Sequence, residues 1–334
     1  MGLSPFGVAA AKDSRWAFVS LSGQNAIGVY SRDAALAPAP ARQIRVPGAI
    51  YGEALTPDGR YLLAADGGAG AEVISVAAAE RGSSRAVLGD MTDDAGTGSI
   101  DVAVTPDSRY AFVSLEDSGE IAVFDIGRAV AGGFGTAGYV GSIPVGPTPT
   151  NVVFSPDGRW AYATNEGLLD APGTLDVISV RKAETDPAAS VVARVPAGCN
   201  PVRVITSATG GVVWVSDRAS DAVLAFSAAR LQKSPGRALL ADVRVGEAPV
   251  GLALVRNGTR IVVADSNRFQ IPGATASLAV IDVPDAIGGM PALLGYLPAG
   301  LFPREMALAF GGRTLLVANY ISNQLESVNV AGLP

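Results

Sequence analysis

Short apolar segments alternate with polar turns along the whole chain, and they return in the same order about every fifty residues. Each unit contains a small-residue apolar segment, a tight turn of the Asp-Gly type, a second apolar segment, and a third that ends in Val or Ile and Asp or Ser. The clearest copies begin at Ala49, Ser99 and Pro149. Apolar segments of strand length around Asp-Gly turns are typical of β-hairpins. Self-similarity at this period indicates a propeller or a solenoid.

Seven such units can be aligned along the chain. Their spacing suits blades of four antiparallel strands, here named A to D along the chain. We therefore predict an all-β fold, a seven-bladed β-propeller that forms a single domain over residues 1–334. Asp58-Gly59, Asp107-Ser108 and Asp157-Gly158 mark A–B hairpins. The blades begin near Pro5, Ile50, Ser99, Pro149, Pro201, Pro249 and Pro303.

The last unit offers no segment for a fourth strand, because only four residues follow Val330. The sequence thus predicts a seventh blade of three strands, joined to the first blade mainly by side-chain packing. Its outer strand, Leu325 to Val330, carries one charge, and an unpaired edge of this kind is open to pairing with another chain. We expect a monomer or a dimer formed through this edge.

Composition narrows the function mainly by exclusion. A formal net charge of −6 disfavours nucleic-acid binding, and no apolar run has the length of a membrane span. The chain has no histidine, which excludes Ser-His-Asp and Cys-His catalysis and histidine-ligated metal sites. We expect no metal and no cofactor. With Cys199 as the single cysteine there is no internal disulfide, which fits a cytoplasmic protein or an exported one whose leader has been removed.

The repeat phrases SPDGRWAYATN…GTLDVISV and PREMALAFGGRTLLVANYISNQLESVNV resemble the YVTN and lactonase-like seven-bladed propellers. That group includes bacterial surface-layer repeat proteins, propeller 6-phosphogluconolactonases and fungal-type carboxymuconate cyclases. The resemblance covers almost the whole chain and implies the fold, whereas the shared residues are structural and do not imply one activity. The cyclase branch implies a site with Arg, Glu and His, which this chain cannot reproduce intact. The one position of this sequence that matches a motif of the lactonase-like members is the Pro-Arg at Pro303 and Arg304, which opens a blade.

One column of the repeat departs from its apolar consensus. In propeller blades the start of strand A and the B–C turn lie on the same face, so residues early in strand A surround the mouth of a central channel, where ligands bind well. In each blade, the residue two positions after the start is a glycine, an asparagine or a residue of either charge. These residues are Gly7, Gly52, Asp101, Asn151, Arg203, Gly251 and Glu305.

We interpret this column as a candidate site for a small-molecule substrate. Arg203 and Arg304 would bind a carboxylate or a lactone carbonyl, while Glu305 and Asp101 would act as acid and base. The expected additional substrate contacts are Asn151, Tyr51, Asn165 and Asn319. Equally open is that the charges only pair with one another across the channel.

Two functions remain open at this point. The first is a metal-independent lactonase-like enzyme, a hydrolase or a lactonising isomerase, that acts on a small carboxylated or lactone substrate at the channel mouth. The alternative is a non-catalytic propeller of the YVTN type that recognises a protein or a glycan on the same face.

Overall fold

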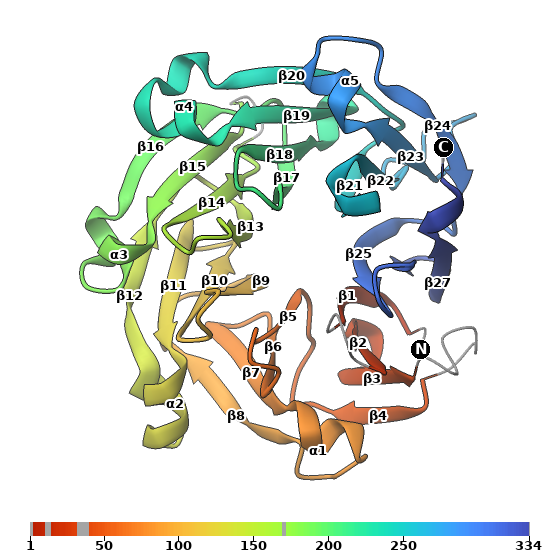
Figure 1. Ribbon diagram of the computed structural model, residues 1–334. Helices are drawn as coiled ribbons and strands as arrows, with labels where there is room; N and C mark the ends of the chain where they lie inside the picture. The colour runs from red at the N-terminus through yellow and green to blue at the C-terminus, as the bar shows by residue number, and fades with distance from the viewer. Residues whose placement is uncertain (1–2, 11–14, 32–39, 169–171, 334) are drawn as a thin grey trace.

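The seven repeat units fold into seven small antiparallel sheets that stand around a common axis (Figure 1). The computed structural model describes residues 3–10, 15–31, 40–168 and 172–333. Six sheets have four strands and the seventh has three, each in simple sequential order. The predicted seven-bladed all-β propeller with a three-stranded last blade is confirmed.

The innermost strand of each blade is strand A, which lies next to the axis in Figure 1. These strands are β1 (Pro5–Ala10), β5 (Glu53–Leu55), β9 (Ser99–Val104), β13 (Pro149–Phe154), β17 (Pro201–Thr206), β21 (Pro249–Val255) and β25 (Pro303–Ala309). The B strands are β2 (Trp16–Leu21), β6 (Tyr61–Ala65), β10 (Tyr110–Leu115), β14 (Trp160–Asn165), β18 (Val212–Asp217), β22 (Arg260–Asp265) and β26 (Thr314–Asn319).

The outer strands and five short helices form the rim of the ring (Figure 1). The C strands are β3 (Ala26–Ser31), β7 (Gly70–Ser75), β11 (Glu120–Asp125), β15 (Thr174–Ser179), β19 (Ala222–Ser227), β23 (Ser277–Asp282) and β27 (Gln324–Asn329). The D strands are β4 (Arg42–Arg45), β8 (Val87–Thr92), β12 (Tyr139–Pro144), β16 (Val191–Pro196), β20 (Leu239–Arg244) and β24 (Leu293–Pro298). The α-helices follow strand C: α1 (Val76–Glu80), α2 (Ile126–Gly132), α3 (Val180–Ala183), α4 (Ala228–Lys233) and α5 (Val283–Ile287).

A repeated hydrogen-bond motif forms three of the A–B turns. The hydroxyl groups of Thr56, Thr105 and Ser155 each donate to the Asp two residues later, at 2.6 Å. Each hydroxyl also accepts the amide of the first residue of strand B, at 3.0 Å. The side chains thus provide partners for turn amides that the sheet leaves free. The hairpins predicted at Asp58, Asp107 and Asp157 therefore form.

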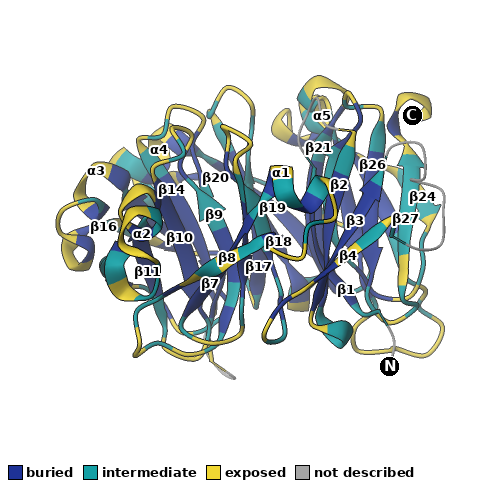
Figure 2. Ribbon diagram, turned by 90° about the horizontal axis from the view of Figure 1, so that it is seen from below, coloured by how far each residue is buried: buried dark blue, intermediate teal, exposed yellow. Residues whose placement is uncertain are grey.

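The hydrophobic core lies between neighbouring blades. Apolar side chains from the facing surfaces of two sheets form one cluster per interface; Val177 and Tyr162, for example, pack with Val213 and Phe226. Figure 2 shows the buried strands running between two faces whose loops are mostly exposed. The B strands and most C strands are covered on both sides by neighbouring blades, so they read as nearly continuous apolar segments, whereas the outer D strands are partly exposed. No described helix is long and apolar enough to cross a membrane.

The ring closes where the first blade packs on the last, and the two chain ends lie on the same side of the ring (Figure 1). Val8 and Leu21 of blade one share a cluster with Leu316 and Ala318 of blade seven. The described part of this junction also includes a hydrogen bond from the Ser4 amide to Asn323 Oδ1, at 2.8 Å. Side-chain packing therefore joins the first and last blades, as the sequence indicates.

Candidate functional site

Four polar side chains from four different inner strands meet at one level of the axis. Asn151 donates from Nδ2 to Asp101 Oδ2 at 2.5 Å and accepts the Val204 amide at 2.8 Å. Arg203 donates from Nε to Glu305, with which it also forms an ion pair. The structure thus brings together all four charged or amide residues of the column, in two partnered pairs.

Glycines in the same column allow neighbouring inner strands to approach closely. A Cβ atom on Gly52 would overlap Asp101 Oδ1, and one on Gly251 would overlap the carbonyl oxygen of Arg304. Glycine is therefore needed at these two positions so that neighbouring inner strands can lie close together, and not for turn geometry. Gly52 in particular leaves the space that the Asp101 carboxylate occupies.

A cavity of about 550 Å³ contains three members of this group, Asp101, Asn151 and Glu305. It extends along the inner strands to exposed prolines of the A–B turns, Pro57 and Pro106 among them. The sequence interpretation expected a pocket at the opposite end, where the B–C turns converge. A pocket at that end stays a prediction, because the cavity at the A–B turns does not test it.

Glu53 also lines this cavity, and sequence reasoning missed it. Both carboxylate oxygens are buried, and no side chain among the described residues donates a hydrogen bond to them. Burial raises the pKa of Glu53 to about 8, against a smaller opposing effect of the Ala9 backbone. A usable signal was present, because Glu53 is the one acid in a column that otherwise holds Val8, Val102, Val152, Val204, Leu252 and Met306.

The charged groups of the ring have perturbed acidity. Burial raises the pKa of Asp101, while the charge of Arg203 and the hydrogen bond from Asn151 oppose the shift. Burial lowers the pKa of Arg203, and the charges of Asp101 and Glu166 oppose it. Asp101 thus has an increased tendency to carry a proton, whereas Glu305 is held beside a guanidinium.

Arg203 also belongs to an arginine cluster with Arg218, Arg268 and Arg304, which extends from the level of the ring away from the cavity. Burial lowers the pKa of Arg304 well below its ordinary value, and the charges of the other three lower it further. Nε of Arg304 and Nε of Arg218 are buried without hydrogen-bond partners among the described residues. Arg218 forms an ion pair with Glu166 at 2.6 Å. The candidate column of the sequence analysis did not include Arg218 or Arg268.

Aromatic side chains surround Arg304 and narrow this end. The guanidinium lies 3.6 Å from the centre of the Phe6 ring and 5.7 Å from that of Phe302. Tyr51 packs edge-on against Phe6 at 5.1 Å between ring centres, and Tyr320 does so against Phe302 at 5.7 Å. Tyr51 and Arg304 therefore lie together, at the opposite end of the axis from the cavity.

Asn165 and Asn319 are bonded within their own blades. Both are fully buried at the ends of their B strands. The amide of Asn165 donates to Thr174 Oγ1 at 3.0 Å, and that of Asn319 donates to Glu326 Oε2 at 2.9 Å. These contacts connect strands B and C of one blade. Among the described residues no group of three or more Cys, Asp or Glu side chains is placed to hold a metal ion.

Comparison with known families settles the relationship of the chain. The sequence profile of the family described as lactonase, 7-bladed beta-propeller, matches residues 53–250, more than half of the chain. The chain belongs to this lactonase family. The match of this lactonase-family propeller includes Asp101, Asn151 and Arg203 but ends before Arg304 and Glu305. No curated protein is similar enough in sequence to count as a match.

A solved structure supports the architecture of the lactonase-family propeller. A chain of hydrazine synthase from Kuenenia stuttgartiensis superposes with a TM-score of 0.80. The alignment covers 99% of this chain and 96% of that chain at 17% sequence identity. At this identity the likeness concerns the fold alone.

Proposed function

We propose that this lactonase-family propeller hydrolyses a small lactone in the central cavity. The observation that carries the proposal is that Asp101 and Glu305, two carboxyl groups in contrasting surroundings, line the same cavity of about 550 Å³. Pairs of titratable groups whose environments separate their acidity are characteristic of acid and base roles. The family to which the chain belongs agrees with this reaction class.

The two carboxyl groups divide the chemistry of ring opening. Glu305, which is paired with the Arg203 guanidinium, accepts a proton from water. The water oxygen bonds to the lactone carbonyl carbon, the ring C–O bond breaks, and the leaving alkoxide takes a proton. Asp101, whose pKa is raised by burial, supplies that proton. Asn151 orients Asp101 through their 2.5 Å hydrogen bond.

Arginine provides the attraction for an acidic substituent on the substrate. Arg203 connects the cavity level with the arginine cluster, since it pairs with Glu305 and its charge acts on Arg304. Arg304 supplies an unpartnered buried Nε to a carboxylate that reaches past the ring. The proposal gives Tyr51 a place in the wall of this anion site. It gives Asn165 and Asn319 structural roles within their blades.

The test is ring opening followed in a pH-stat, with γ-butyrolactone and a γ-lactone that bears a carboxymethyl group. Asp101→Asn and Glu305→Gln should each lower kcat at least ~100-fold, the usual contribution of a positioned acid or base. Arg304→Met should raise KM for the carboxylated lactone and leave that for the neutral lactone unchanged. Arg85→Met, which changes an exposed arginine on the rim, is the matched control.

A non-catalytic binding propeller is the second candidate, and one observation favours it. Asp101 and Asn151 bond to each other, and so do Arg203 and Glu305, so the ring already satisfies most of its polar groups. In that case the carboxylated lactone would raise the melting temperature of the wild type without being opened. Ring opening at the buffer rate with both lactones would overturn the enzyme proposal.

A further inference from the structure

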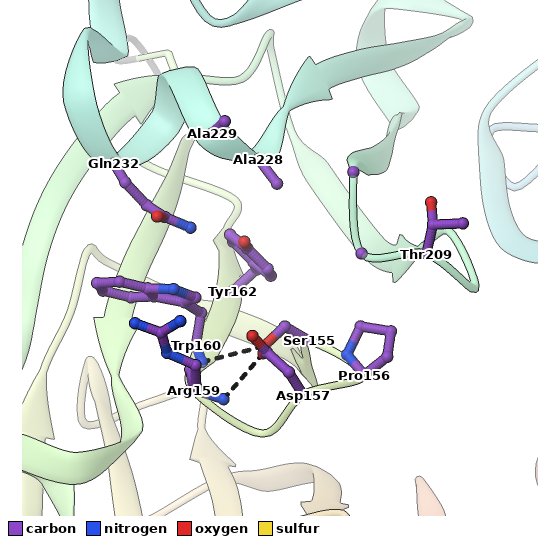
Figure 3. Close-up of a pocket in the computed structure, with 12 residues that line it drawn as sticks. Ser155, Pro156, Asp157, Arg159, Trp160, Tyr162, Thr209, Ala228, Ala229 and Gln232 are labelled. Atoms are coloured by element: carbon purple, nitrogen blue, oxygen red, sulfur yellow. Dashed lines mark hydrogen bonds between the residues drawn. The ribbon is translucent and has the colours of Figure 1, made fainter.

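A second cavity of about 490 Å³ lies between blades four and five, away from the axis (Figure 3). Blade four contributes Asp157, Arg159, Trp160 and Tyr162, and blade five contributes residues of its A–B turn and of helix α4, including Gln232. The volume is within the range of small-ligand pockets. Neither the lactone proposal nor the family match assigns a role to this cavity.

Comparison with other blades shows what is unusual here. Trp160 is the first residue of strand B, and at this position three other blades place a guanidinium over an aromatic ring. Arg42 lies 4.7 Å from the Trp16 ring centre, Arg60 5.6 Å from that of Tyr61, and Arg109 5.1 Å from that of Tyr110. Within the described part of the chain, Trp160 has no such cation–π partner. Its neighbour Arg159 lines the cavity instead.

The cavity therefore offers an aromatic surface together with polar groups at its edge. The indole of Trp160 is half-buried and packs on one side against the cluster that includes Val204 and Val213. The Tyr162 hydroxyl is buried, from a residue only 1% exposed, and its hydrogen-bonding neighbour is the Gln232 side chain. In Figure 3 the amide of Gln232 extends toward Trp160 and Tyr162.

We propose that this cavity binds a pyranose sugar whose ring stacks on Trp160. A pyranose with equatorial hydroxyl groups has an apolar C–H face, which the negative face of an aromatic ring attracts. Its hydroxyl groups both donate and accept, so they match the Gln232 amide, the Arg159 guanidinium and the Asp157 carboxylate. Asp157 and Arg159 balance in charge, which favours a neutral ligand. A flat aromatic ligand would leave these polar groups without partners.

Cellobiose is the probe, because all ring substituents of its two glucose units are equatorial, apart from the reducing-end hydroxyl in the α anomer. Titration calorimetry with the wild-type protein should give a dissociation constant in the millimolar range. Trp160→Ala should weaken binding at least ~10-fold by removing the stacking surface, and Gln232→Ala should weaken it less. Tyr61→Ala is the matched control, since it changes the same blade position where Arg60 already covers the ring; it should bind as the wild type does.

Each outcome decides the proposal, independently of lactone hydrolysis. Absence of heat with cellobiose in the wild type would overturn it. Binding that is unchanged in both Trp160→Ala and Gln232→Ala would place the sugar elsewhere and overturn it as well. Gln232 is a half-exposed helix residue, so its variant still tests the site if Trp160→Ala fails to fold.

Discussion

At the scale of single residues, Glu53 is the most unusual side chain in the molecule. Six of seven blades place Val, Leu or Met at its position, whereas blade two places a carboxyl group whose buried oxygens accept no hydrogen bond from a described side chain. A buried unpartnered acid destabilises the folded state, and such costs concentrate at functional sites. Its place in the wall of the central cavity agrees with that rule.

Glu53 should make the protein less stable as the pH rises. Its pKa of about 8 in the folded protein lies above the ordinary value of 4.5, so the folded state binds the proton more tightly. The free energy of unfolding should therefore decrease from about pH 4.5 to about pH 8, at up to roughly 1.4 kcal/mol per pH unit, and level off above that range. Urea unfolding curves of the wild type and Glu53→Gln at several pH values measure this.

The Gln variant should lose most of this decrease. Glu53→Val, which installs the residue that four other blades have at this position, should be the more stable protein at pH 8. Asp186→Asn is the control, because Asp186 is an exposed acid at the rim. A wild-type decrease with pH that Glu53→Gln retains in full would show that other groups cause it.

At the scale of elements, the inner strands depend on glycine for their spacing. Strand β21 approaches β25 so closely at Gly251 that a Cβ atom would overlap the Arg304 carbonyl oxygen. The obstacle is backbone, which cannot rotate away as a side chain can. The same contact fixes the position of the Arg304 backbone. The spacing of β21 and β25 therefore also determines where this candidate binding residue lies.

Gly251→Ala should destabilise the protein by about 1–3 kcal/mol, the usual cost of overpacking a core. The melting temperature should fall by several degrees. Gly236→Ala is the matched control, because no atom lies within 4 Å of the position its Cβ would take. Equal melting temperatures for the two variants would mean that β21 can move away from β25 without cost.

At the scale of the whole molecule, the outer edges of the blades are not equally protected. Strands β8 and β12 contact the short helices of the following blade, η3 (Thr136–Gly138) and η4 (Pro187–Ala189), and β16 and β20 contact α4 and α5. Strand β27 is the outermost strand of the three-stranded blade, and in the described part of the chain only β26 pairs with it. An edge without cover is a site for pairing with another strand.

We expect the protein to form a concentration-dependent dimer through β27. Sedimentation velocity over a range of protein concentrations should show the dimer increasing in the wild type. Gln324→Lys adds a charge at this edge and should shift the population to monomer. Gln43→Lys makes the same change on the outer strand β4 and should have no effect; a wild type that stays monomeric at all concentrations would contradict the expectation.

The sequence was sufficient for the architecture, because each blade repeats the same apolar segments and turns. It also identified Asp101, Asn151, Arg203 and Glu305 as one group, since a shared repeat position places side chains at one level of the axis. It did not reveal Glu53, because the candidate residues were taken from the repeat position one residue before that of Glu53. Nor did it show that the cavity lined by Asp101, Asn151 and Glu305 extends to the A–B turns, because strand periodicity does not tell where side chains leave space.

The junction of blades one and seven has a consequence for the order of folding. Ser4 and Asn323, which bond across it, are separated by 319 positions in the chain. Contacts so distant in sequence carry a high entropic cost of closure and form late. During synthesis, the apolar surface of blade one that includes Val8 and Leu21 therefore has no partner until blade seven has been made. The growing chain remains an open arc with one exposed apolar end, and that end is where a chaperone or a misfolded neighbour would bind first.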